Sequence, residues 1–596
     1  MKPIVFEGHF GWLHAGTEKR GVILCNTYGH EHVWTYQGMR YLADELSARG
    51  IWVLRFDYLG TGDSAGSDGA PDQFDTSVKD IHAAIDYLKQ QAGIEHVTLC
   101  GFRVGAAFAL AAALEKRVDD LVLLAPVISG RTYMRELSIV RKTWLEQLSP
   151  PLRAVQQERP LNVLGQTYDD SFVRALEAVD VASGIERAAA AAAPARRALI
   201  VQTRASTKDA VRDALIARGV HVDTQTFEDF TSFIQEPAFS VLPKLTYDAA
   251  IVWMSNELQR REPSKMDAQW THDPIIPTPE AIERPVCIGD EMLFGVMCEP
   301  RTSVTRGPVY LIANTSASAH VGDSRLSVRV ARELARRGIA SLRIDARGRG
   351  DSPSALQDHS FASIYDSIAT TDTASAARWL VREGYKTVYT FGICSGAYHA
   401  LKSALIEPSI KGVVAVNLPT FKRPENKAPD APREAARNSM AGYAISMFDP
   451  AKWLSIMRGE KKLLPMVRFI IGNLATRVRC RLIDALHLDA WRSVSPESAT
   501  EPMQMMRALD AKGVKTILVH GAYDASMDVL AAHFGSRGAR LSRFSSVRVA
   551  VLDHIDHALF NPASSAEVIA LCDAAIREPE AQETRSKLPV GAHAVS

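Results

Sequence analysis

An internal repeat constrains this chain more than any other feature. The segment VILCNTYGHEH at residues 22–32 is matched by YLIANTSASAH at 310–320, and LADELSARGIWVLRFDYLGTGDS at 42–64 is matched by VARELARRGIASLRIDARGRGDS at 330–352. Equivalent positions, such as Asn26 and Asn314, lie 288 residues apart in both pairs. One offset held without a gap over this distance indicates that a whole domain has been duplicated. The length of 596 residues also calls for more than one hydrophobic core.

The two copies share one pattern of predicted secondary structure. In the first copy, short runs such as GVILCN, GIWVLRFD and DLVLLAP alternate with amphipathic stretches such as YQGMRYLADELSARG. Apolar strands separated by helices are typical of a parallel sheet that helices cover on both faces. We therefore predict the α/β fold class, with two tandem domains that each hold a mostly parallel, doubly wound sheet and a helical cap insertion.

Shifts in composition suggest where the domains begin and end. Residues 256–284 are polar, rich in Pro and aperiodic, which indicates a linker between a domain at 1–255 and another at 285–577. We expect the polar tail at 578–596 to be disordered. The predicted caps lie at about 128–195 and about 418–500. The second is amphipathic, which fits a lid over an apolar pocket and packing on the core equally well.

Composition excludes several classes of function. The formal net charge is +1 and no long Lys/Arg run occurs, which argues against a nucleic-acid partner. The first residues lack the pattern of a secretory signal, and no apolar run reaches the roughly 18 residues of a membrane span. Seven scattered cysteines without CxxC pairs argue against a disulfide scaffold or a zinc site. We expect a cytoplasmic protein without cofactor or metal; the oligomeric state stays open.

A candidate nucleophile lies in the second copy. The run Gly392-Ile393-Cys394-Ser395-Gly396 follows an apolar strand and precedes a helix. This arrangement is typical of the nucleophile elbow of the α/β-hydrolase fold, with the nucleophile at the tip of a tight turn. Cys394 occupies the tip, and Ser395, one position later, is a poorer candidate. Partial positive charge at the helix start favours the thiolate. The alternative is that Cys394 is a buried small residue at a decayed elbow.

The partners that such a nucleophile needs follow in the expected order of nucleophile, acid and histidine. Asp524 follows the strand in KTILVHGAYDAS, with Asp528 as a fallback. His554 and His557 follow the strand in VRVAVLDHIDHALFNP, and we favour His557 because Asp-His-Ala-Leu-Phe resembles a motif common around the superfamily's catalytic histidine.

These residues predict a covalent mechanism. His557 would take the proton of Cys394, Asp524 would fix the tautomer of His557, and the thiolate would attack an acyl carbonyl. The resulting oxyanion would be held by the backbone N–H of Ser395 and by an N–H from the loop Asn314-Thr315-Ser316.

The first copy differs at all three positions. Its elbow, Gly101-Phe102-Arg103-Val104-Gly105, places Arg103 where the nucleophile would be. Alignment of the later segments places Ser206 opposite Asp524 and Ser232 opposite His557. Because arginine cannot act as nucleophile or base, we expect no acyl chemistry in this half. Arg103 either binds an anion, such as a carboxylate or phosphate, at the helix start or pairs with a neighbouring Asp or Glu in a purely structural role.

Two further features occur in both copies. The motifs that begin at Asp57 and Asp345 and end in Gly-Asp-Ser are interpreted as a turn that the fold requires. His32 and His320 follow the predicted oxyanion loops, where they could reach a pocket or make a structural hydrogen bond.

Both halves resemble α/β-hydrolases of the serine-aminopeptidase-like group, and more closely the hydrolases found beside exosortase and exopolysaccharide gene sets. The first half carries this resemblance in LRFDYLGTGDSAG and PVISGRTYMREL, and the second in FGICSGA and YAISMFDPAKWLSIMRGEKKL. Arg103 departs from the pattern. Cysteine elbows also occur in dienelactone hydrolases, which open lactones, and in polyhydroxyalkanoate synthases, which transfer acyl groups.

Three functions follow as hypotheses. The first is a hydrolase that cleaves an ester, thioester or lactone through an acyl-cysteine intermediate. The second is an acyltransferase that uses the same residues and a hydroxyl or amine acceptor. The third is a non-catalytic binding or scaffold protein. The expected partner for the first two is a small-molecule acyl substrate, free or linked to a carrier or coenzyme A.

Overall fold

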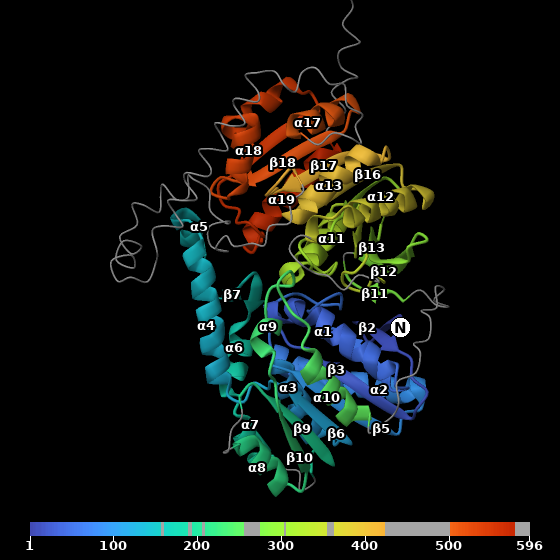
Figure 1. Ribbon diagram of the computed structural model, residues 1–596, viewed down its shortest axis with the longest axis vertical. Coiled ribbons are helices and arrows are strands. Elements are labelled where there is room, and N and C mark those ends of the chain that lie inside the picture. Colours follow the sequence, from blue (N-terminus) through green and yellow to red (C-terminus); the bar gives the residue numbers. More distant parts are fainter. Residues whose placement is uncertain are drawn as a thin grey trace, which may run out of the picture.

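The computed structural model describes residues 1–156, 160–188, 193–204, 209–255, 274–279, 281–302, 306–353, 363–422 and 501–577. Within these residues the chain forms two large, mostly parallel sheets, one in each half (Figure 1). The predicted α/β class with two doubly wound sheets is confirmed. The predicted second cap and the C-terminal tail lie outside the described residues, except for 418–422. No helix that the structure describes is long and apolar enough to cross a membrane.

The first sheet has the strand order β1-β2-β4-β3-β5-β6-β9-β10. The pairs β1–β2 and β2–β4 are antiparallel, and all later neighbours are parallel. Its strands are β1 (Lys2–Phe6), β2 (His9–His14), β3 (Arg20–Cys25), β4 (Trp52–Phe56), β5 (His96–Phe102), β6 (Asp120–Leu124), β9 (Arg197–Gln202) and β10 (His221–Thr226).

The second sheet repeats this order with one added edge strand, as β11-β12-β13-β15-β14-β16-β17-β18-β19. Its antiparallel strands again precede the parallel ones. The strands are β11 (Ile276–Pro277), β12 (Ala281–Ile288), β13 (Leu293–Pro300), β14 (Pro308–Ile312), β15 (Ala340–Ile344), β16 (Thr387–Ile393), β17 (Ile410–Val416), β18 (Lys515–Gly521) and β19 (Val547–Leu552).

Helices cover both faces of each sheet, which explains the continuous apolar runs. In β3, Ile23 and Cys25 pack on one face while Val22 and Leu24 pack on the other, and all four are buried. Because side chains alternate along a strand, a strand covered on both sides must be apolar at every position. The helices on one face of the first sheet are α2 (Gln73–Ala92), α3 (Val104–Glu115) and α8 (Ala210–Ala217), and those on the other are α1 (His30–Ser47) and α10 (Lys244–Ser255).

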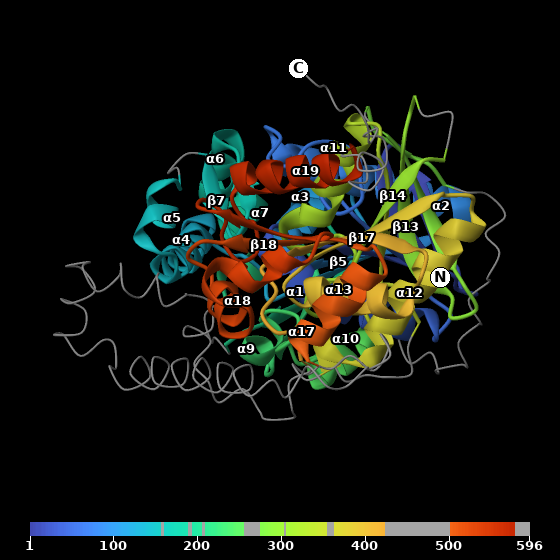
Figure 2. The ribbon, with the colours of Figure 1, turned by 90° about the horizontal axis from the view of Figure 1, so that it is seen from above.

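The second sheet is covered in the same way. Seen from above, α11 and α19 lie together on one side of β17 and β18, and the other helices of the second half lie on the opposite side (Figure 2). The pair is α11 (Leu326–Arg336) and α19 (Pro562–Arg577). The opposite layer holds α12 (Ser367–Arg382), α13 (Ser395–Ile406), α17 (Pro502–Ala511) and α18 (Ser526–Phe534).

The first half carries an insertion between β6 and β9. It contains a long helix and a one-turn helix, followed by a short hairpin and two further helices. Its elements are α4 (Gly130–Gln147), α5 (Pro150–Ala154), β7 (Leu161–Val163), β8 (Gln166–Tyr168), α6 (Asp170–Ala178) and α7 (Val181–Arg187). Figure 1 shows α4 running from the first half towards the second half.

The predicted linker extends too far. Its last residues form β11 and the start of β12 rather than an aperiodic connection. Glu283 explains the error, because its side chain is buried in β12 and pairs with Arg343 on β15 at 3.0 Å. Because this charged residue faces inward, it interrupts the apolar pattern by which a buried strand is predicted.

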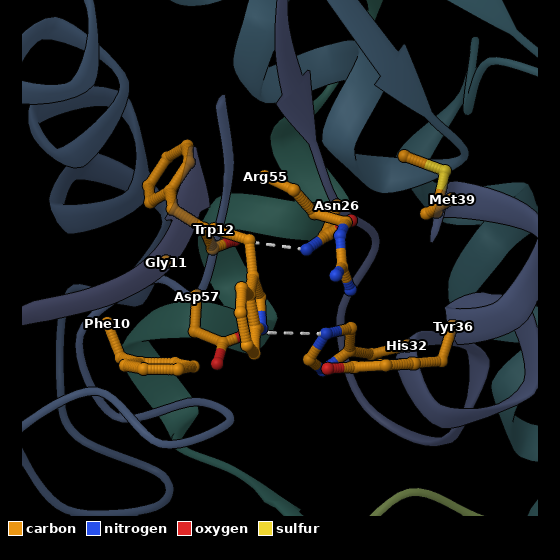
Figure 3. A pocket seen from close by; sticks show the side chains of 10 residues that line it. Phe10, Gly11, Trp12, Asn26, His32, Tyr36, Met39, Arg55 and Asp57 are labelled. Carbon is orange, nitrogen blue, oxygen red and sulfur yellow. Dashed lines mark hydrogen bonds and ion pairs between the residues drawn. The ribbon is translucent and has the colours of Figure 1, made fainter. Parts of the chain in front are cut away.

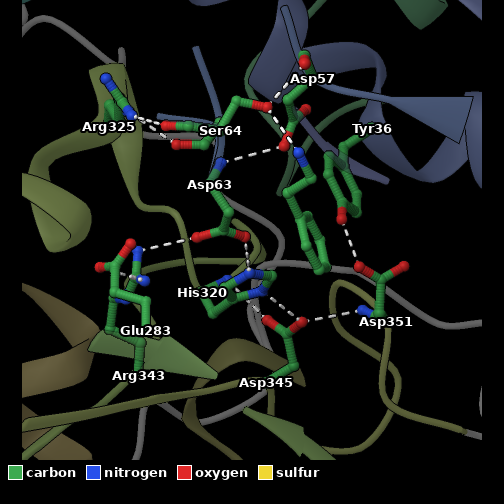
Figure 4. Close-up of polar contacts among 12 residues, drawn as sticks. Tyr36, Asp57, Asp63, Ser64, Glu283, His320, Arg325, Arg343, Asp345 and Asp351 are labelled. Carbon is green, nitrogen blue, oxygen red and sulfur yellow. Dashed lines mark hydrogen bonds and ion pairs between the residues drawn. The ribbon is translucent and has the colours of Figure 1, made fainter. Parts of the chain in front are cut away.

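Two buried ion pairs join the halves, and they are reciprocal: each pairs an arginine of one half with an aspartate of the other. Arg55 Nη2 lies 2.5 Å from Asp351 Oδ1, and Arg343 Nη1 lies 2.8 Å from Asp63 Oδ1. Arg55 and Arg343 are equivalent positions of the repeat, as are Asp63 and Asp351. His320 lies between the carboxylates of Asp63 at 2.6 Å and Asp345 at 2.8 Å (Figure 4). Such reciprocal contacts are those of a self-complementary interface between two like domains.

Candidate active site

The predicted elbow is present in the second half. Cys394 lies between β16 and α13 with φ 54° and ψ −121°, a conformation that non-glycine residues rarely adopt. The flanking glycines allow the close packing of strand, helix and loop. A Cβ on Gly392 would lie 2.2 Å from the backbone of Gly396, and one on Gly396 would lie 2.7 Å from the carbonyl oxygen of Asn314.

The predicted acid and histidine lie together. His557 Nδ1 and Asp524 Oδ2 are 2.8 Å apart, on the loops that follow β19 and β18. Burial by itself would raise the pKa of Asp524, but the charge of His557 and hydrogen bonds from His557 and Ser526 outweigh it and lower that pKa below its usual value. The fallback Asp528 is not needed for this pairing, and His554 is exposed.

The thiol of Cys394 completes the arrangement. Cys394 lies close enough to His557 to act on the charge of the imidazole, and the Cys394 side chain is partly exposed. Burial would lower the pKa of His557, but the nearby Asp524 carboxylate and Cys394 outweigh it and raise that pKa well above its usual value. Thiol, imidazole and carboxylate therefore lie together at the elbow.

Tyr365 is a neighbour of the sulfur that the sequence did not single out. Its hydroxyl lies close to Cys394, and its ring packs edge-on against Tyr398 at 5.5 Å. Burial, with Cys394 close by, raises the pKa of Tyr365, which keeps the phenol protonated as a donor. Tyr365 lies in the short helix η2 (Ser363–Tyr365), far from the elbow in sequence, and no motif marks it.

Asn417 joins the acid and histidine loops, and the sequence analysis also missed it. Its side-chain nitrogen donates to the carbonyls of Asp556 at 2.9 Å and His557 at 3.0 Å, and its side-chain oxygen accepts from the N–H of Gly521 at 2.9 Å. The one available signal is a polar residue directly after the apolar run of β17. One buried amide therefore fixes the loops that carry both partners of Cys394.

The predicted oxyanion loop lies against the elbow. The N–H of Ser316 donates to Ser395 Oγ at 2.7 Å, and Thr315 Oγ1 donates to the carbonyl of Ile393 at 3.2 Å. The Asn314 side chain instead accepts from the N–H of Ala346 at 2.7 Å and so binds the loop to the turn after β15. The Ser316 N–H is thus engaged within the protein, which leaves the Ser395 and Thr315 amides as the predicted oxyanion donors.

The first half keeps the elbow without the nucleophile. Arg103 has φ 54° and ψ −119°, nearly the angles of Cys394. Its guanidinium pairs with Glu31 at 3.0 Å and with Glu136 on α4. This geometry corresponds to the structural alternative for Arg103, whereas anion binding stays a prediction. Ser232 lies on α9 (Phe230–Phe233), and Ser206 lies outside the described residues.

The turns that begin at Asp57 and Asp345 are structural in both halves. Ser64 Oγ donates to the carbonyl of Asp57 at 2.7 Å, and Ser352 Oγ donates to that of Asp345 at 2.5 Å. His32 lies 3.4 Å from Asp57 beside a small cavity, with Trp12 and Arg55 in its lining (Figure 3).

His320 and Asp345 are the repeat equivalents of His32 and Asp57. Their cluster is the one place where described side chains could hold a metal. His320, Asp345 and Asp351 offer ligand atoms within 4.8 Å of one another. Both ring nitrogens of His320 already face carboxylates. Burial would lower the pKa of His320, but the charges of Asp345 and Asp63 outweigh it and raise that pKa well above its usual value. Because both nitrogens of the ring are engaged by carboxylates, the cluster is best explained as an ion-pair network.

Residues 17–220 match the family model of the serine aminopeptidases, S33. The matched segment contains the strands β3, β4, β5, β6 and β9, the elbow and the whole cap of the first half, but not β1, β2 or β10. The match, the strand order of both sheets and the two elbows support the α/β-hydrolase superfamily. The matched residues lie in the half that carries Arg103, so the match gives no information on Cys394.

Solved structures of α/β-hydrolases match single halves of the chain. Est1E from Butyrivibrio proteoclasticus, solved with ferulic acid, is 16% identical over 43% of this chain and 99% of its own, with a TM-score of 0.28. A dienelactone hydrolase from Anabaena variabilis is 16% identical over 50% of this chain and 96% of its own, at 0.28. The Pyrococcus furiosus esterase Pf2001 is 16% identical over 43% and 90%, at 0.30. No curated protein matches. These distant similarities assign no activity.

Proposed function

We propose that the second half of this α/β-hydrolase cleaves an ester, thioester or lactone through an acyl-cysteine intermediate on Cys394. The observation that carries the proposal is the chain of contacts from the Cys394 thiol through His557 to Asp524, built on the elbow geometry that presents a nucleophile. We also infer that the chain arose by tandem duplication, since both sheets have the same strand order and the repeat holds one offset. In this account the first half is not catalytic.

The chemistry follows from the placement of each group. His557 takes the thiol proton, and the sulfur forms a bond to the acyl carbonyl carbon. The resulting oxyanion accepts hydrogen bonds from the Ser395 N–H and from the loop at Thr315. When the intermediate collapses, the bond to the leaving alcohol or thiol breaks and His557 returns its proton to that group. Water, deprotonated by His557, then hydrolyses the thioester and restores the Cys394 thiol.

The raised pKa of His557 supports this assignment. An imidazole held between a carboxylate and a sulfur is stabilised in its charged form, which is the form it takes when it has accepted the proton of Cys394. Tyr365 adds a protonated hydroxyl near Cys394.

Acyl transfer is the second candidate, and the cysteine favours it. A thioester intermediate is readily attacked by an alcohol or amine, so a hydroxyl acceptor in place of water would give a transferase with the same residues. The expected substrate in both cases is a small acyl compound, free or bound to a carrier or coenzyme A.

Turnover of a short-chain p-nitrophenyl ester and of acyl-coenzyme A tests the proposal. We expect Cys394→Ala to abolish release of the leaving group and Cys287→Ala, a matched change at another partly exposed cysteine, to leave it intact. Equal background rates in wild type and Cys394→Ala would instead support a non-catalytic scaffold. Faster turnover with added alcohols or amines, with formation of the acylated acceptor, would assign the transferase.

A further inference from the structure

The cap of the non-catalytic half reaches the loops that carry His557 and Asp524. Trp144, on α4, packs edge-on against Phe560 with 5.8 Å between ring centres, and Phe560 lies three residues after His557. Leu148 and Leu152 extend the same apolar cluster to Tyr523, the residue before Asp524. Trp144, Leu148 and Leu152 are all buried. Both loops of the candidate site therefore rest on one surface of the first half.

The cap hairpin adds a directed polar contact. Asn162 Nδ2 donates to the backbone carbonyl of Phe560 at 3.2 Å, while Asn162 Oδ1 accepts from the N–H of Gly165 at 2.9 Å. The second bond fixes the orientation of the amide, so that its nitrogen must face Phe560. Phe560 is held from its other side as well, because its N–H donates to Asp556 Oδ1 at 2.9 Å.

The turn of this hairpin fits closely against the second half. Leu164 and Gly165 both have positive φ, at 50° and 88°, as a two-residue hairpin turn of type I′ requires. A Cβ on Gly165 would lie 2.7 Å from the Phe560 ring and 3.1 Å from Ser324, which also donates to the carbonyl of Leu164 at 2.5 Å. A glycine here serves the contact with the other half as well as the turn.

The hairpin is in turn anchored to its own domain. Gln166 Nε2 donates to the hydroxyl of Tyr28 at 3.1 Å, and the ring of Tyr168 stacks on Phe172 at 5.9 Å. Tyr28 lies between β3 and α1, and its ring packs edge-on against Tyr168 and Phe172. The contact with Phe560 is thus carried by a rigid element and not by a free loop.

We propose that Trp144 and Asn162 are positioning residues for the reaction of the other half, and that the non-catalytic half has been kept because its cap holds the histidine loop in place. This inference rests on the proposed function at Cys394. It assigns the first half a mechanical role in catalysis that needs no ligand of its own.

Two readouts on the full chain test the proposal, namely the rate of acylation of Cys394 by an acyl thioester and the pKa of His557. The pKa is measured by NMR with ¹³C-labelled histidine, and the signal is assigned by its loss in His557→Gln. We expect Trp144→Ala and Asn162→Leu to slow acylation about 10- to 100-fold, because misplacing a reacting group by about 1 Å has effects of this size. The pKa of His557 should fall towards its usual value as its contact with Asp524 loosens.

Matched variants separate positioning from general damage to the fold. Trp144→Phe keeps an aromatic ring against Phe560 and should retain most of the rate, and Ile139→Ala changes an exposed residue on the same helix and should have no effect. Asn162→Leu is similar in shape to the wild type, so it decides the question if Trp144→Ala fails to fold. Wild-type rate and wild-type pKa in Asn162→Leu would overturn the inference. Absence of acylation in the wild type would overturn the proposed function, while the pKa readout would still decide the positioning role.

Discussion

At the scale of single residues, the two elbows separate the demands of the fold from those of chemistry. Cys394 and Arg103 have nearly the same strained backbone angles, although only Cys394 has an acid–histidine pair beside it. Such a conformation costs about 1–3 kcal/mol, and the surrounding glycines and hydrogen bonds maintain it in both halves. The strain therefore belongs to the way strand, turn and helix are joined, whichever residue occupies the tip.

Arg103 should act as a structural ion pair. Removing it in Arg103→Ala leaves the buried Glu31 carboxylate without its partner, and we expect a loss of about 3 kcal/mol in the free energy of unfolding, measured with urea. Glu136→Gln, at a half-exposed partner, should cost less than about 1 kcal/mol. If phosphate or acetate stabilises the wild type but not Arg103→Ala, Arg103 binds anions instead.

Asp524 should be needed for the orientation of His557. Asp524→Asn keeps the size of the side chain but offers the wrong hydrogen-bonding group to Nδ1, so we expect acylation of Cys394 to slow roughly 10²- to 10⁴-fold. The pKa of His557 should fall, because the largest cause of its increase is removed. Asp528→Asn is the matched control, and equal losses in the two variants would refute the assignment of Asp524.

At the scale of elements, the site depends on the ends of β16, β17, β18 and the loop after β19. Parallel strands bring their carboxyl ends to one edge of the sheet, which is where an α/β protein places its reactive groups. Asn417 links three of these ends and adopts φ 48°, in the left-handed region. The arrangement of the site is therefore a property of neighbouring strand ends rather than of one motif.

Replacing Asn417 should weaken both the fold and the site. Asn417→Ala removes three hydrogen bonds and puts alanine in the left-handed region, which alanine adopts less readily than asparagine. We therefore expect about 3 kcal/mol of destabilisation. Asn417→Gly loses the same bonds but tolerates the backbone angle, and it should be about 1 kcal/mol more stable than Asn417→Ala. Thermal unfolding and acylation rates measure both effects; no loss of acylation in either variant would contradict the role of Asn417.

The sequence predicted elements and motifs better than it predicted contacts. Both sheets, the first cap and the elbow follow from apolar runs and from glycines at fixed spacing, because these patterns are local. Tyr365 and Asn417 were missed because their roles depend on where the fold brings them. The linker was drawn too long because Glu283 interrupts the pattern of β12, and its burial makes sense only with Arg343 opposite.

At the scale of the whole molecule, a buried polar network lies between the halves, in addition to apolar contacts. At its centre is His320, which faces Asp63 and Asp345, with Asp351, Glu283 and Arg343 around them (Figure 4). Arg55 pairs with Asp351. Burial favours the neutral forms of these groups, but the opposite charges outweigh it, so the pKa of His320 is raised and that of Asp351 is lowered. The interface is thus stabilised by charges that depend on one another.

This network predicts how stability changes with pH. A raised pKa in the folded state means that His320 stabilises the fold fully below about pH 6.5 and loses that contribution as the pH rises through its folded-state pKa. Asp351, with a lowered pKa, keeps its contribution until the pH falls below its usual value of about 4. We therefore expect the midpoint of thermal unfolding to decline above pH 6.5. His320→Gln should flatten this decline, whereas His554→Gln, at an exposed site, should not; equal slopes would contradict the account.

The central claim is that Cys394 carries the acyl group. Intact mass and peptide mapping of the full chain after exposure to a set of acyl thioesters test it directly, because a trapped adduct reports both the nucleophile and the acyl group that it accepts. We expect one acyl group on the peptide that contains Cys394, present in Cys287→Ala and absent in Cys394→Ala. An adduct that persists in Cys394→Ala, or no adduct on the wild type with any acyl thioester, would contradict it.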